Sequence, residues 1–87
     1  MAGQAGKPQD LKKRTFSFAV DIVGLCRKIE MHSDAYRILG RQLLRSGTSV
    51  GSNTKEAQSG QSRADFVSKY AIALNEARET IYWLRPI

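Results

Sequence analysis

The sequence lacks the features that identify disulfide-bonded, membrane-spanning and secreted proteins. It contains one cysteine, Cys26, so it cannot form an internal disulfide. Asp21 interrupts the most apolar run, residues 18–25, and no run approaches the roughly 20 residues that cross a bilayer. Residues 1–14 also lack the apolar core of a signal peptide. We therefore expect a cytoplasmic protein with no membrane partner.

Alternation of β-branched and polar residues is absent too, and apolar residues instead recur every three or four positions. This pattern predicts an all-α chain, an antiparallel up-and-down helix bundle, with helices at about residues 11–30, 34–59 and 63–85. Residues 1–10 carry no periodic hydrophobes. They are expected to form a flexible basic arm before a single helical domain at 11–87.

What the chain has in excess is positive charge. Its formal net charge is +6 and its pI is about 9.9. Such a balance favours anionic partners, namely RNA, DNA or an acidic protein surface, although it also serves solubility and says nothing of the fold.

The second predicted helix is rich in small residues. Gly40, Gly47 and Gly51 align beside its apolar stripe. Each glycine costs roughly 1 kcal/mol in a helix, so the row predicts that a neighbouring backbone comes close or that the helix bends. Three polar side chains line the other edge of the stripe, where we expect hydrogen bonds at a helix contact: Ser46, Ser49 and Asn53.

The helix starts are marked by capping residues. Ser33 or Asp34 is expected to accept a hydrogen bond from the first free N–H groups of the second helix. Ser62 followed by Asp65 predicts a capping box at the start of the third.

The third predicted helix has two apolar faces. Besides its main stripe it carries Ile72 and Trp83 on a separate face, and Tyr82 beside Trp83. A terminal aromatic pair is more typical of an oligomer contact than of base stacking, so we assign these three residues to an interface between subunits. A fourth helix, a symmetric copy of the chain, or both are expected to cover the remaining apolar surface.

The most specific pattern lies between Arg45 and Leu84. The run RSGTSVGSN at 45–53 is followed by Glu56-Ala57, by Ala64-Asp65-Phe66, and by IALNEARET at 72–80 with Tyr82-Trp83-Leu84. In these blocks the chain resembles a family of small bacterial four-helix-bundle proteins encoded in intervening sequences of large-subunit (23S) ribosomal RNA genes. Accessory proteins of diversity-generating retroelements are distant relatives of that family.

The resemblance covers about residues 15–85. It implies four antiparallel helices, a ring-like homo-oligomer that is typically a pentamer, and a basic surface toward nucleic acid. It does not imply a known enzyme, and we expect no cofactor. The motif residues that we interpret as structural are Ser49, Gly51, Asn53, Glu56, Glu76, Arg78 and Glu79.

The chain departs from the family pattern in two places. Thr54 and Lys55 stand where an apolar and a small residue are usual, which predicts weaker packing there. Pro86 stands where the fourth helix commonly continues, so we expect three long helices, with the fourth missing or truncated. The pattern leaves open whether Ile87 is the natural end.

Arg37, Arg41 and Arg45 recur every four residues and, with Lys55, form the predicted nucleic-acid site. The row spans roughly 12 Å of helix, so phosphates could be matched along it. The alternative is a solvated face that pairs with acidic side chains of a neighbouring subunit. No RNA-recognition motif, zinc finger or helix-turn-helix pattern is present to decide between them.

Catalytic and metal sites have little support. Di-metal bundles use Glu-x-x-His pairs, whereas the single histidine, His32, falls in a predicted loop. We expect the carboxylates of Glu56, Glu76 and Glu79 to pair with Arg78 or with arginines of another chain. Cys26 lies in an apolar arc without a base beside it, so we expect a small core residue. These patterns predict a non-enzymatic oligomer that binds RNA or DNA or, alternatively, a scaffold or accessory subunit for a nucleic-acid enzyme such as a reverse transcriptase.

Overall fold

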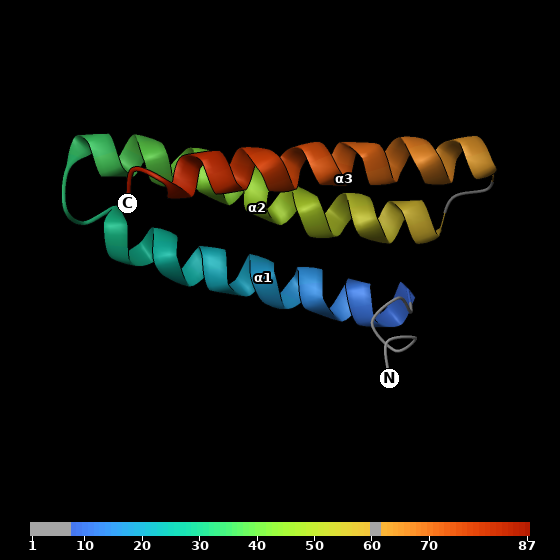
Figure 1. Cartoon of the computed structure of the whole chain (residues 1–87). Coiled ribbons are helices and arrows are strands. Elements are labelled where there is room, and N and C mark those ends of the chain that lie inside the picture. The colour runs from blue at the N-terminus through green and yellow to red at the C-terminus, as the bar shows by residue number, and fades with distance from the viewer. Residues whose placement is uncertain (1–7, 60–61) are drawn as a thin grey trace.

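The computed structural model describes residues 8–59 and 62–87, which form three helices and no strand. The helices are α1 (Pro8–Ile29), α2 (Asp34–Gln58) and α3 (Arg63–Leu84). Each helix runs antiparallel to the one before it, and α2 packs against both α1 and α3 (Figure 1). The predicted all-α bundle with three long helices is confirmed. None of the helices described is long and apolar enough to cross a membrane.

The helix α1 begins earlier than the sequence pattern indicates. It starts at Pro8 rather than near Leu11, so the expected flexible arm is wrong for residues 8–10. Proline suits a first helical position because that position has no intrahelical partner for an N–H, and its fixed φ is already helical. The carboxylate of Asp10, in the first turn, is stabilised by the positive end of the helix dipole. The rest of the expected arm, residues 1–7, lies outside the described residues.

Both α2 and α3 begin with a serine N-cap, which at α3 is one half of the predicted capping box. Ser33 Oγ accepts a hydrogen bond from Tyr36 N at 3.1 Å, which makes Ser33 rather than Asp34 the N-cap of α2. Ser62 Oγ accepts from Asp65 N at 3.1 Å at the start of α3. These bonds satisfy free backbone donors and fix where each helix begins.

The helix α1 lies close against the glycine edge of α2. A Cβ at Gly47 would lie 2.9 Å from Ile22 Cγ2, and one at Gly51 would lie 3.4 Å from the backbone oxygen of Thr15. Between them and the loop, Gly40 O accepts from Cys26 Sγ at 3.1 Å. The glycines thus permit a short distance between the two helices, as their alignment predicts.

The contact between α2 and α3 includes a buried hydroxyl pair. Ser46 and Thr80 are both 0% exposed, and their hydroxyl oxygens lie 2.9 Å apart. Ser49 and Asn53, which we expected to bond across a helix contact, instead donate within α2, to Arg45 O at 2.7 Å and Ser49 O at 2.9 Å. Their side chains are short and half-exposed, so the nearest free acceptor is the carbonyl one turn back.

The apolar core is concentrated at one end of the bundle. Near the α1–α2 connection, Ile22, Cys26, Ile29 and Leu43 form a buried cluster, against which Trp83 and other residues pack. At the opposite end of α2 the buried residues are smaller, for example Thr54 and Ala57. Thr54 is 2% exposed and its hydroxyl donates to Val50 O at 2.8 Å, so this family departure places a satisfied polar group in the core.

Several large apolar side chains remain exposed on the outer helices. On α3 they include Leu74 and Ile81, which are 53% and 60% exposed. The helices α1 and α3 flank α2 with little contact between them, so neither covers the other (Figure 1). The described residues therefore present apolar surface of the kind that is usually covered in an assembly.

Candidate nucleic-acid interface

The arginine row predicted from the sequence lies on α2, but its members have different surroundings. Arg37 Nη2 donates to Asp34 Oδ1 at 2.8 Å, one turn earlier in the helix. Arg41 is exposed, and no carboxylate of residues 8–59 or 62–87 lies within ion-pair distance of it. An exposed surface pair contributes only about 0–1 kcal/mol, so a phosphate could displace Asp34 from Arg37 at little cost.

The third arginine is engaged inside the chain. Arg45 Nη1 donates to Glu76 Oε2 at 3.0 Å, and Arg45 Nη2 donates to Glu79 Oε2. The same oxygen of Glu79 accepts from Trp83 Nε1 at 3.0 Å. The guanidinium thus joins α2 to α3, whereas we had assigned it to nucleic acid and had expected the carboxylates to pair with Arg78 or another chain. Arg78 is exposed on α3.

The remaining carboxylate of the motif is also paired across helices. Glu56 Oε2 lies 3.0 Å from Lys69 Nζ on α3. In the part of the chain that the structure describes, no three histidine, cysteine, aspartate or glutamate side chains converge to hold a metal ion. The motif carboxylates therefore act here as links between α2 and α3.

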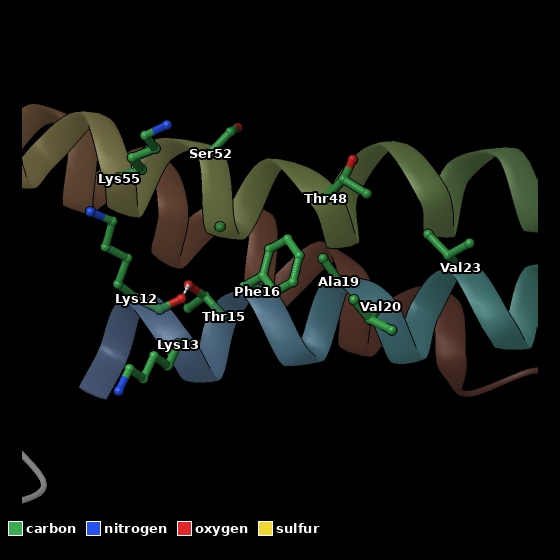
Figure 2. A pocket seen from close by; sticks show the side chains of 11 residues that line it. Lys12, Lys13, Thr15, Phe16, Ala19, Val20, Val23, Thr48, Ser52 and Lys55 are labelled. Atoms are coloured by element: carbon green, nitrogen blue, oxygen red, sulfur yellow. Dashed lines mark hydrogen bonds between the residues drawn. The ribbon is translucent and has the colours of Figure 1, made fainter. Parts of the chain in front are cut away.

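Lys55, the fourth residue of the predicted site, lies away from the arginine row. It stands near the end of α2 and lines a trough between α1 and α2, together with Lys12 and Lys13 of α1 (Figure 2). Ten residues of helix separate Lys55 from Arg45, or about 15 Å along the axis. The structure therefore divides the predicted basic site into two parts.

Sequence reasoning missed the apolar side of this trough. Phe16 and Val20 line it outside the apolar arc that the sequence indicates for helix 1, whereas Val23 belongs to that arc. Their spacing of four and three residues is itself a helical stripe, and Lys12 lies one turn before it. A search for a second stripe on helix 1 would have found these residues.

Cys26 has the environment of a core residue. It is 4% exposed and its thiol donates to the carbonyl of Gly40. Burial raises the pKa of the Cys26 thiol, and the nearby Glu30 carboxylate raises it further. A neutral thiol is a poor nucleophile, so this position offers no reactive group.

The three residues assigned to a subunit interface differ in their exposure. Ile72 and Tyr82 are 41% and 60% exposed on α3. Trp83 is half-buried, packs against the core cluster of its own chain and stacks edge-on with Tyr82 at 5.0 Å between ring centroids. Of these three residues, only Ile72 and Tyr82 are exposed enough to be available to a second molecule.

Comparison with protein families shows which family this chain belongs to. The model of the family described as 23S rRNA-intervening sequence protein matches residues 7–87. The chain belongs to this family. This family member is similar to a crystal structure of a protein with unknown function from the S23 ribosomal protein family of Bacteroides thetaiotaomicron, with 46% sequence identity and a TM-score of 0.81. The match covers 90% of this chain and 69% of that chain. A search of curated proteins found no match.

The family assignment confirms the resemblance to the intervening-sequence protein family that the motif blocks carry, while the distant similarity to retroelement accessory proteins stays a prediction. In this family member the motif residues Ser49, Asn53 and Gly51 serve helix geometry and packing, and Glu76 with Glu79 ties α3 to α2. The solved relative is of unknown function, and its description names no enzymatic activity. Functional inference for this member therefore depends on its surfaces.

Proposed function

We propose that this family member is a non-enzymatic, self-assembling helix bundle protein, in keeping with the pentamers implied by the resemblance, that binds RNA or DNA through the exposed guanidinium groups of Arg37 and Arg41. The observation that carries the proposal is Arg41, an exposed cation without a carboxylate in reach among the described residues. Arg37, one turn earlier on the same helix, adds a second charge that is held only by a surface pair. The net charge of +6 favours approach to a polyanion.

The experiment is a salt titration of binding to a structured RNA and to a DNA duplex. Replacing Arg37 and Arg41 by glutamine removes two phosphate contacts, so the slope of log K against log salt should fall by about 2. Arg45 is left unchanged, because its loss would remove the cation that forms ion pairs with Glu76 and Glu79 and would weaken the α2–α3 contact.

The matched control replaces Arg14 and Arg63 by glutamine. Both are exposed and lie on other helices, so the net charge changes equally while the arginine row stays intact. An equal loss of affinity in the two double variants would show that binding depends on total charge alone and would reject this site.

A second candidate is a scaffold or an accessory subunit for a nucleic-acid enzyme, such as a reverse transcriptase. The exposed apolar residues of α3 favour it, because a partner subunit would cover Leu74 and Ile81. A partner protein that stays bound in pull-downs after nuclease treatment would support this function. Partners that disappear with nuclease would support the first.

A further inference from the structure

A second surface, on the side of α1 and α2, has the shape and chemistry of a docking site. The trough there has a volume of about 870 Å³ and is lined by side chains of both helices (Figure 2). It extends from Lys12 to Val23, twelve residues of α1, or about 17 Å of helix axis. That length equals three turns of a helix.

The middle of the trough is apolar and uncovered. Phe16 is 71% exposed and Val20 is 53% exposed, although both are large hydrophobic side chains. In Figure 2 the ring of Phe16 projects from α1 toward α2. On the α2 wall, Thr48 Oγ1 donates to Leu44 O at 2.6 Å, so its hydroxyl is satisfied within its own helix. This part of the wall therefore offers a ligand little hydrogen bonding.

One end of the trough is positively charged. Lys12, Lys13 and Lys55 line it there: Lys12 reaches from α1 toward α2, Lys13 points away from α2, and the amine of Lys55 points away from α1 (Figure 2). None of the 11 lining residues is acidic. Glu56, the carboxylate next to Lys55, pairs with Lys69 on α3 instead. The lysines thus lack compensating charge on the trough walls.

We propose that this trough binds an acidic amphipathic helix of a partner protein. The apolar side chains of that helix would cover Phe16, Val20 and Val23, and its carboxylates would meet the three lysines. Helices bind grooves in this way through apolar side chains spaced three and four residues apart. Charge complementarity orients the partner and excludes basic helices of the same shape.

Other occupants fit the trough less well. A bare acyl chain would stay partly wetted in an open trough, whereas small-molecule sites bury most of their ligand. A nucleobase would lose hydrogen-bond partners on an apolar floor of this kind. A helix brings its own polar outer face, so it can fill the trough and remain hydrated on the side away from it.

This surface is distinct from the arginine row, and the inference does not rest on nucleic-acid binding. Replacing Arg37 and Arg41 by glutamine should therefore leave peptide binding at the trough unchanged. The two proposals can fail separately.

The test uses a display library of helical peptides of about 18 residues, selected against the full chain. Each peptide carries leucines at positions i, i+4 and i+7, while its flanking positions are open to glutamate, lysine, glutamine and serine. Selection should enrich glutamate toward one end. Repeating it with the variant Lys12→Glu, Lys13→Glu and Lys55→Glu should enrich lysine there instead, because the charge at the trough is reversed.

Affinity measurements with one selected acidic peptide complete the test. The charge-reversed variant should bind it roughly tenfold more weakly or worse, and Phe16→Ser with Val20→Ser should lose comparable affinity. Because Phe16 and Val20 are exposed, their replacement should leave the helical circular dichroism unchanged.

The controls alter matching residues elsewhere. Arg14→Glu, Lys28→Glu and Arg63→Glu give the same net charge on other surfaces, and Ile38→Ser removes an apolar side chain that is 63% exposed. Equal losses in these controls, or no acidic enrichment, would overturn the proposal. It would also be overturned if the trough variants lost instead their self-association or their binding to phosphatidylglycerol vesicles or RNA.

Discussion

Cys26 is kept protonated by its surroundings. Burial, and then the Glu30 carboxylate, raise the pKa of its thiol above the ordinary value of 9.0. Above that pH the unfolded chain loses a proton that the folded chain retains. The unfolded state then binds fewer protons than the native state, so the free energy of unfolding must fall as the pH rises.

This linkage can be measured by comparing the native chain with Cys26→Ala. Between about pH 8 and pH 10, urea unfolding should show a steeper loss of stability in the native chain, because the variant lacks the titrating thiol. The other titrating groups are common to both proteins and cancel in the comparison. Parallel stability curves would contradict the raised pKa.

Arg45 illustrates why the candidate site could be predicted only in part. A four-residue step turns a helix by about 40° beyond a full circle, so Arg45 lies about 80° around α2 from Arg37. That rotation brings it to Glu76 and Glu79 on α3. The four-residue spacing identified three candidate arginines on one helix. Which of them meets a carboxylate depends on how the neighbouring helix packs, and the spacing carries no information about that packing.

At the scale of whole helices, glycine controls the contact between α1 and α2. At Gly47, three atoms of Ile22 lie within 3.2 Å of the position that a Cβ would occupy, and Ile22 is 4% exposed and β-branched. Such a side chain has few alternative rotamers. Gly24, on the exposed side of α1, has no atom within 4 Å of the same position apart from those of its chain neighbours and its own helical backbone.

The two glycines predict opposite effects of alanine. Gly24→Ala should raise the free energy of unfolding by about 1 kcal/mol, because alanine is the better helix former. Gly47→Ala should lower it by about 1 kcal/mol, since the clash with Ile22 exceeds the same gain in helix propensity. Urea unfolding with unchanged m-values would measure both. Stabilisation by Gly47→Ala would show that α1 does not approach as closely as described.

The positions of most helix ends could be predicted from the sequence. Periodicity and the caps Ser33 and Ser62 located α2 and α3 to within a residue or two, because these are local interactions. The start of α1 at Pro8 was missed, since no apolar residue there signals a helix. The hydrogen bonds of Ser49 and Asn53 were assigned to the wrong partners. A helical-wheel projection shows the side of the helix on which a side chain lies, but not its distance from a neighbouring helix.

Across the whole molecule, packing is uneven. The large buried side chains gather near the α1–α2 connection, whereas small and polar ones fill the opposite end. Apolar surface is also left exposed on α3, including Ile72 and Tyr82. A domain of this size buries only about 60–65% of the surface of its unfolded chain, so self-association is an effective means of covering more.

Light scattering of the purified chain should therefore show an assembly. Replacing Ile72 and Tyr82 by serine should shift it toward the monomer, because both side chains present apolar surface to a neighbour. Trp83 is left unchanged, since it packs against its own core. Ile38→Ser on α2 is the control and should assemble normally. A monomeric native chain would contradict this interface.

Trp83 also makes the bundle optically observable. It is the chain's one tryptophan, its indole N–H donates to Glu79, and Glu79 in turn accepts from Arg45 of α2. Separation of α3 from α2 would wet the indole and shift its fluorescence to longer wavelength. The trough that begins at Lys12 lies toward the other end of α1, so a peptide seated there should leave the emission nearly unchanged. Trp83 fluorescence thus distinguishes loss of the bundle from occupation of its surface.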